Sequence, residues 1–105
     1  MLVVFALLAL IGAPIVEEIA FRGMLFGSLT KSHFTPLMAS LISSGVFALF
    51  HFEPKRFLVL FVVGAVLGEA RRRSGSTLAS VVAHAINNAP GVLSLLAVHV
   101  ALIGH

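Results

Sequence analysis

PIVEEIAFRGMLF, residues 14 to 26, places two adjacent glutamates and an arginine inside an otherwise apolar run. An isolated carboxylate in hydrocarbon is costly, so charged side chains in such a run face the interior of a bundle and pair with one another. Arg22 lies one helical turn from Glu18 and can neutralise that carboxylate, which leaves Glu17 free to titrate and to hold water. The stretch therefore predicts a helix in which one glutamate is structural and the other is functional.

The composition places the whole chain in a membrane. Of its 105 residues, 59% are hydrophobic and only 10% are charged, whereas about a quarter of the residues of a soluble domain are charged. The apolar segments are too long for barrel strands and do not alternate, so we expect an all-α integral membrane bundle of about four helices in a single domain, residues 1–105. The absence of cysteine excludes thiol catalysis.

The breaks between the apolar segments predict where the helices begin and end. The expected helices cover residues 2 to about 29, 36 to about 51, 57 to about 70, and 77 to about 103. Ser76 or Thr77 can cap the fourth helix, and Pro90 with Gly91 predicts a kink within it.

Basic residues predict the orientation of the chain and its lipid partner. The net charge of +3 lies mainly in short connections, so we expect contact with anionic lipid and not with nucleic acid. The first and third connections carry Lys31 and the three arginines at 71 to 73, against Lys55 and Arg56 in the second. The positive-inside rule places the first and third loops on the cytoplasmic side of an inner membrane, with the three arginines as a topology anchor.

Three pairs of side chains share a spacing of four residues: Glu18 with Arg22, Phe47 with His51, and His84 with Asn88. Residues four apart lie on one face of a helix, so three helices each offer one polar or aromatic stripe. At about 1.5 Å per residue, the polar members lie roughly 12 to 22 Å from one face of the membrane. We therefore expect a common polar layer in the middle of the membrane.

With these residues the chain resembles the CPBP family of CAAX proteases and bacteriocin-processing membrane proteins, which includes the type II CAAX prenyl endopeptidases. The family motifs EExxxR, FxxxH and HxxxN correspond to EEIAFR at 17 to 22, FALFH at 47 to 51 and HAINN at 84 to 88. Three motifs in order on three apolar helices are specific, and the match spans residues 14 to 90. The resemblance implies an intramembrane endopeptidase acting on a membrane-associated or lipidated substrate.

Carried over by position, the resemblance implies that Glu17 is the general base and that His51 helps to hold the attacking water. His84 and Asn88 would donate hydrogen bonds to the oxyanion of the tetrahedral intermediate. Asn87 ranks second as the amide donor, because its spacing from His84 is three.

Other residues are expected to support this site. Glu18 with Arg22 would fix the base, and Phe47 would shape the cavity by packing. Four small residues are expected to let helices approach closely: Ser40, Ser43, Ser44 and Gly45. The remaining histidines are interpreted as structural residues: His33, His99 and His105.

The participation of a metal is left open. Glu17, His51 and His84 could ligate Zn²⁺ with a water in the fourth position, and members of the family have been described both as metalloproteases and as metal-free glutamate proteases. We favour glutamate-activated water, because the sequence offers no obvious carboxylate partner for the imidazoles.

Two other functions stay open: a non-catalytic membrane immunity or accessory protein of the bacteriocin self-immunity type, and a proton or ion pathway through the titratable layer. Family members usually carry further transmembrane helices before the EExxxR helix, so the chain is expected to be a minimal core or a fragment. Prenylated CAAX protein, peptide pheromone and bacteriocin precursor are all compatible substrates.

Overall fold

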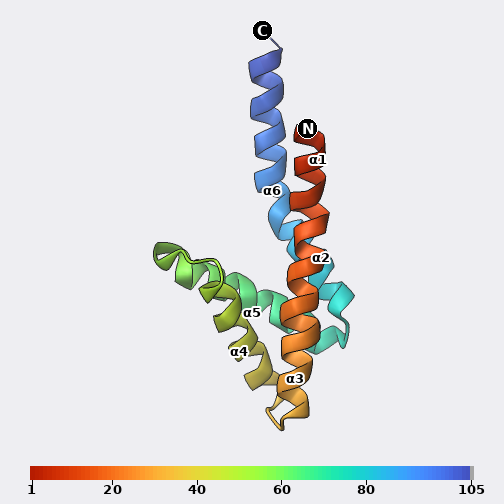
Figure 1. The fold of residues 1–105 in the computed structure, drawn as a ribbon, viewed down its shortest axis with the longest axis vertical. Coiled ribbons are helices and arrows are strands. Elements are labelled where there is room, and N and C mark those ends of the chain that lie inside the picture. Colours follow the sequence, from red (N-terminus) through yellow and green to blue (C-terminus); the bar gives the residue numbers. More distant parts are fainter. Residues whose placement is uncertain (105) are drawn as a thin grey trace.

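The computed structural model describes residues 1 to 104, and in this part of the chain every regular element is helical (Figure 1). Four helices follow one another, as the sequence predicts. The first, Leu2–Lys31, is continuous but contains two π-helical segments. Its parts are α1 (Leu2–Leu7), η1 (Leu8–Gly12), α2 (Ala13–Glu18), η2 (Ile19–Leu25) and α3 (Phe26–Lys31). The later elements are α4 (Pro36–Leu49), η3 (Pro54–Arg56), α5 (Phe57–Ser74) and α6 (Thr77–Ile103).

The predicted helix ends are close to the observed ones, with two corrections. α4 ends at Leu49, so His51 lies in the following turn and not in the helix. α5 continues to Ser74, so the three arginines that we expected in a connection lie in its last turn. Cations are favourable there, because they meet the negative end of the helix dipole. α6 begins after Ser76, whose hydroxyl accepts a hydrogen bond from the Leu78 amide at 3.1 Å, as a helix cap does.

Pro14 explains the first π-helical segment. Proline has no N–H, and in a regular helix its ring collides with the carbonyl four residues earlier. In η1 the helix widens instead, and the Ala13 amide bonds to the Leu8 carbonyl, five residues back. Neither Ala13 nor Pro14 then donates to the carbonyl of Ala9, which is left to accept from another helix.

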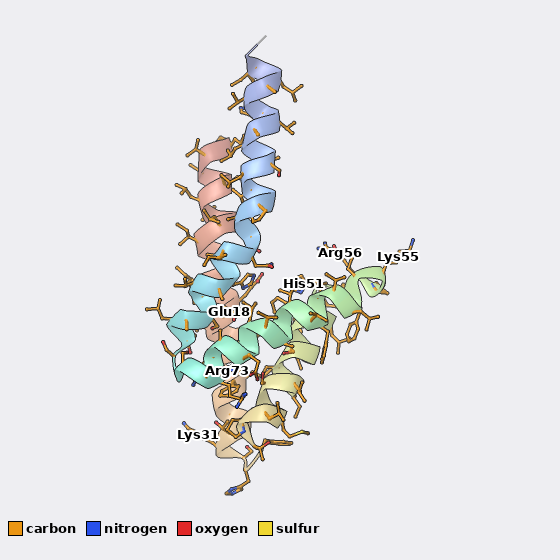
Figure 2. The ribbon with its side chains drawn as sticks, turned by 180° about the vertical axis from the view of Figure 1, so that it is seen from behind. Glu18, Lys31, His51, Lys55, Arg56 and Arg73 are labelled. Carbon is orange, nitrogen blue, oxygen red and sulfur yellow. The ribbon has the colours of Figure 1, made fainter. Side chains whose placement is uncertain are left out.

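The helices form a long pair with a hairpin at its side. α6 lies beside the first helix, and α1 packs near its C-terminal half (Figure 1). α4 and α5 pack against each other and leave this pair at an angle, with the second connection at their tip (Figure 1). α6 continues through Pro90, and its axis changes direction near the middle of the helix in both views (Figures 1 and 2).

Small side chains allow α4 and α5 to approach closely. The three serines of α4 expected for this purpose are buried: Ser40, Ser43 and Ser44. Gly45 is only half-buried, whereas two glycines of α5 that the sequence analysis did not single out, Gly64 and Gly68, are buried. A Cβ on Gly64 would lie 3.2 Å from the Cα of Ser44 and 3.1 Å from Cδ1 of Phe47. The hairpin therefore depends on the absence of a side chain at this position.

Two helices are long and apolar enough to cross a membrane, Leu2–Lys31 and Thr77–Ile103. Large apolar side chains on their surfaces are exposed, among them Ile19 at 49% and Ile86 at 67%, as expected of helices that face lipid. α4 has 14 residues and a length of about 21 Å, so it does not by itself bridge a hydrocarbon core of about 30 Å. The side of the membrane that each loop faces stays a prediction.

Gly64→Ala is expected to destabilise the detergent-solubilised protein by about 1–3 kcal/mol, the usual cost of overpacking a tight contact. The added methyl must displace the backbone of Ser44. Thermal unfolding followed by circular dichroism measures the effect. Gly27→Ala is the matched control, because a Cβ there meets nothing within 4 Å. Equal destabilisation by the two substitutions would contradict the tight contact between α4 and α5.

Candidate functional site

The site is built around an ion pair within the first helix. Nη1 of Arg22 donates to Oε2 of Glu18 at 3.1 Å, and both side chains are 0% exposed. Nη2 of Arg22 donates to the Gly64 carbonyl of α5 at 2.5 Å. The guanidinium carbon lies 4.8 Å from the centre of the Phe47 ring of α4. The pair therefore also ties the first helix to the α4–α5 hairpin.

His84 of α6 joins this pair to the other glutamate. Its Nδ1 lies 2.8 Å from Oε2 of Glu18, and its Nε2 lies 3.4 Å from Oε2 of Glu17. Because the Glu18 carboxylate is paired with Arg22, we assign a proton to Nδ1 of the imidazole. Nε2 then faces the Glu17 carboxylate. A proton on Nε2 or on Oε2 of Glu17 prevents two lone pairs from opposing each other. Glu17 and His84 thus lie within ion-pair distance of each other.

Burial distinguishes the two glutamates. The side chain of Glu17 is 36% exposed, whereas that of Glu18 is 0% exposed and that of His84 is 6% exposed. Glu18 is held by a cation and an imidazole, which leaves it no freedom to reach another molecule. Glu17 is the carboxylate that water or a ligand can reach.

The ring of Phe47 connects the two histidines named by the motifs. It is 1% exposed, and its centre lies 4.6 Å from the centre of the His51 ring and 5.8 Å from that of His84. Nδ1 of His51 lies 2.7 Å from the carbonyl oxygen of Phe47. A proton on Nδ1 donates to that oxygen, which leaves the Nε2 lone pair available. His51 lies towards the hairpin tip from Glu18 (Figure 2).

Asn88 has a partner that the motifs do not predict. Its Nδ2 donates to the carbonyl of Ala9 at 3.2 Å, which is the carbonyl that Pro14 leaves free in η1. The amide therefore ties α6 to the first helix, and its second N–H remains for another acceptor. A role for Asn88 at an oxyanion stays a prediction.

Arg71 is a part of the site region that the sequence analysis interpreted differently. Its Nε donates to the carbonyl of Arg22 at 3.1 Å, and its guanidinium carbon lies 4.7 Å from the centre of the Phe26 ring. Arg71 is half-buried in α5 and contacts the first helix, so it is more than a topology anchor in a loop. Gly64 was missed altogether, because a backbone carbonyl gives no signal in a sequence.

The three residues considered as zinc ligands come from three separate parts of the fold: α2, the turn after α4, and α6. Within residues 1 to 104, no group of three or more His, Cys, Asp or Glu side chains could hold a metal ion. The expectation that the imidazoles lack a carboxylate partner is wrong for His84, whose Nδ1 meets Glu18. A carboxylate that holds one nitrogen of an imidazole orients the whole ring. Here Glu18 holds Nδ1, and the other nitrogen, Nε2, faces Glu17.

Two of the other histidines, His33 and His99, lie outside this cluster. His33 and His99 are exposed, and neither makes a side-chain hydrogen bond within the part of the chain that the structure describes. His105 lies outside the described residues. Among the described residues, no side-chain hydrogen bond connects His33 or His99 to the site.

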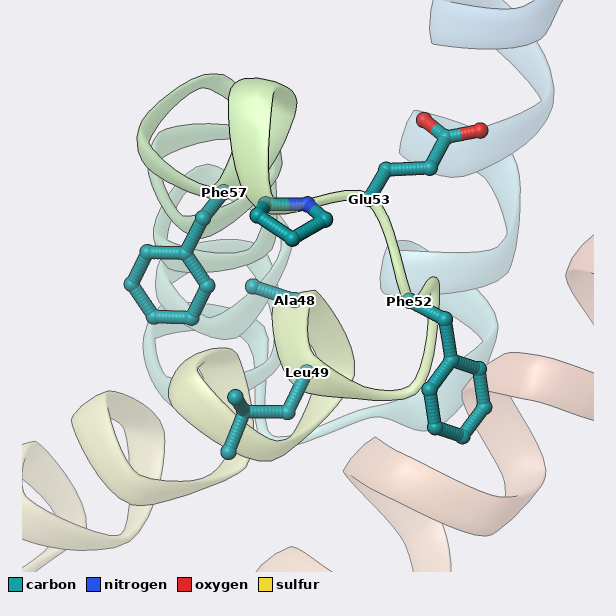
Figure 3. A pocket seen from close by; sticks show the side chains of 6 residues that line it. Ala48, Leu49, Phe52, Glu53 and Phe57 are labelled. Atoms are coloured by element: carbon teal, nitrogen blue, oxygen red, sulfur yellow. The ribbon is translucent and has the colours of Figure 1, made fainter.

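An apolar hollow follows His51 in the chain. It has a volume of about 540 Å³. Its lining residues are Ala48, Leu49, Phe52, Glu53, Pro54 and Phe57. Figure 3 shows the rings of Phe52 and Phe57 on either side of it. The end of α4 therefore contributes to both features: Phe47 contacts the polar cluster, and Ala48 and Leu49 line the hollow.

These features define a class of protein: a helical membrane protein with a carboxylate, imidazole and guanidinium cluster assembled from separate helices. Comparison with protein-family models matches residues 1–90 to the type II CAAX prenyl endopeptidase Rce1-like family. The chain belongs to this family, as its three motifs predicted. Searches among curated proteins and among solved structures gave no match.

Arg22→Met is expected to lower the free energy of unfolding by about 3–5 kcal/mol, because it leaves the Glu18 carboxylate buried without its cation. The double substitution Glu18→Gln with Arg22→Met is expected to recover part of that loss, since no buried charge is then left unpaired. Thermal unfolding in detergent measures both variants.

Glu53→Gln is the matched control for a broken ion pair. Its partner Arg56 is 63% exposed, and exposed pairs contribute little to stability. If the Arg22→Met variant is as stable as the Glu53→Gln variant, the role assigned to the buried pair is contradicted.

Proposed function

We propose that the chain is an intramembrane endopeptidase in which Glu17 activates water for attack on a peptide bond. The observation that supports this most is the contact of Glu17 with His84, whose other nitrogen is held by Glu18. Membership of the type II CAAX prenyl endopeptidase Rce1-like family supports the same reaction.

The proposed chemistry needs a base, a proton donor and an oxyanion partner. Oε2 of Glu17 takes a proton from water as the water oxygen bonds to the carbonyl carbon, and Nε2 of His51 accepts from the water's other hydrogen. The carbonyl oxygen, now negative, receives hydrogen bonds from Nε2–H of His84 and from the second N–H of Asn88. The proton on Glu17 passes to the amide nitrogen as the C–N bond breaks.

The proposed chemistry assigns the base to Glu17 and the oxyanion donor to Nε2–H of His84. The Glu18 carboxylate and the Arg22 guanidinium balance each other beside these two groups, because a buried charge without a partner is costly.

The apolar hollow supports a lipidated substrate. Its volume of about 540 Å³ lies within the range of about 300 to 1,000 Å³ typical of ligand sites. The residues around it are predominantly apolar, and Ala48 at its wall directly follows Phe47 in α4. We propose that the hollow receives apolar parts of a membrane-associated peptide whose scissile bond lies at Glu17.

Glu17→Gln is expected to lower kcat for cleavage of a prenylated peptide by about 10²–10⁴-fold, because the amide cannot take a proton from water. The variant should insert into membranes and unfold at the temperature of the wild type, since Glu17 is partly exposed. Glu69→Gln, the same change at a glutamate that does not line the apolar hollow and pairs with Arg72 and Arg73, should retain activity. Full activity of the Glu17 variant would remove the proposed base.

Cleavage is expected to persist in the presence of a metal chelator, because the proposed base acts on water directly. Metal analysis of the purified, active protein should find no stoichiometric ion. Loss of activity on chelation, with recovery on adding Zn²⁺, would contradict the metal-free mechanism and leave the endopeptidase assignment in place.

A further inference from the structure

A second hollow lies where the second connection faces α6. It has a volume of about 350 Å³. Ala9 of the first helix, Arg56 of η3, and Asn87, Asn88 and Gly91 of α6 are among its lining residues. It shares no lining residue with the apolar hollow at the end of α4. Asn88, one turn along α6 from His84, brings it next to the proposed active site.

Two polar side chains in this hollow have hydrogen-bonding groups to spare. Nη1 of Arg56 donates to Glu53 at 2.9 Å, while its Nε and Nη2 bond to nothing within residues 1 to 104. Asn87 is exposed and makes no side-chain hydrogen bond in that same part of the chain. It lies about 15 Å into α6, where a polar group without a partner is costly. Both side chains therefore offer donors to a ligand or to water.

We propose that this hollow binds the terminal α-carboxylate of the peptide substrate, with Arg56 as its cationic partner and Asn87 as a second donor. A guanidinium presents two parallel N–H groups that match the two oxygens of a carboxylate. The free nitrogens of Arg56 suit this arrangement while Nη1 keeps Glu53. The assignment rests on the proposed function, because it places the chain end of the substrate beside the cleaved bond.

The dimensions agree with a short peptide end. A C-a-a-X terminus has its free carboxylate three residues beyond the modified cysteine, which is about 10 Å in an extended chain. Along α6 the hollow is lined from Asn87 to Leu95, about 5 to 16 Å from His84 at 1.5 Å per residue, a span that includes this length. A substrate with its scissile bond at Glu17 and His84 therefore reaches this hollow with its last residue.

The test compares two prenylated peptides that differ only in ending as a free acid or as an amide. The wild type is expected to cleave the acid with a kcat/KM about 10–100-fold higher, the usual range for a charge-assisted pair. Arg56→Gln should raise KM for the acid by a similar factor, leave kcat nearly unchanged, and leave the amide unaffected. Asn87→Leu should raise KM for the acid about 2–10-fold.

Lys55→Gln is the matched control, because it removes a positive charge from the same connection but does not line the hollow. It should leave the preference for the acid intact. Equal cleavage of the two peptides by the wild type, or the same loss in the Lys55 and Arg56 variants, would overturn the assignment.

Binding separates this inference from the proposed function. If the wild type cleaves neither peptide, the endopeptidase proposal fails, and the affinities of both peptides for the protein in zwitterionic nanodiscs test the carboxylate site alone. Tighter binding of the acid that is lost in Arg56→Gln supports the site, and equal binding overturns it. If adding phosphatidylglycerol to the nanodiscs abolishes the tighter binding of the acid, the hollow binds lipid phosphate, and the carboxylate assignment is also overturned.

Discussion

The buried ion pair of Glu18 and Arg22 is the constraint on which the rest of the structure depends. Two charges cannot stay inside an apolar bundle unless other groups compensate them. Each of the other three helices supplies one such group: the Phe47 ring from α4, the Gly64 carbonyl from α5, and the His84 imidazole from α6. The pair therefore sets the position of these helices around the first one.

This compensation is incomplete, which indicates a role beyond stability. Oε1 of Glu18 and Nε of Arg22 are buried without a hydrogen-bond partner among residues 1 to 104. Well-packed apolar residues often stabilise a core as much as a buried ion pair does. The pair has a second effect that apolar residues could not supply: it holds the imidazole of His84 so that Nε2 meets Glu17.

The two π-helical segments prepare the first helix for its neighbours. η1 and η2 lie on either side of α2, which carries both glutamates. In each segment a side chain from another helix bonds a backbone carbonyl: Asn88 bonds Ala9 in η1, and Arg71 bonds Arg22 in η2. π-helical turns are frequent at functional sites. Here they allow the helix that carries the proposed base to be fixed at both ends by side chains of α5 and α6.

The sequence by itself determined the class of fold, the order of the helices and the residues that meet at the cluster. Charges and imidazoles in apolar helices have few possible partners, so spacing and depth along the helices placed Glu17, Glu18, Arg22 and His84 in one polar layer, together with His51 and Asn88. Only the tertiary structure decided that His51 lies in a turn, that Asn88 bonds the first helix, and that Arg71 and Gly64 take part. These contacts depend on backbone carbonyls and on the local widening of a helix, and neither is written in the identity of any single side chain.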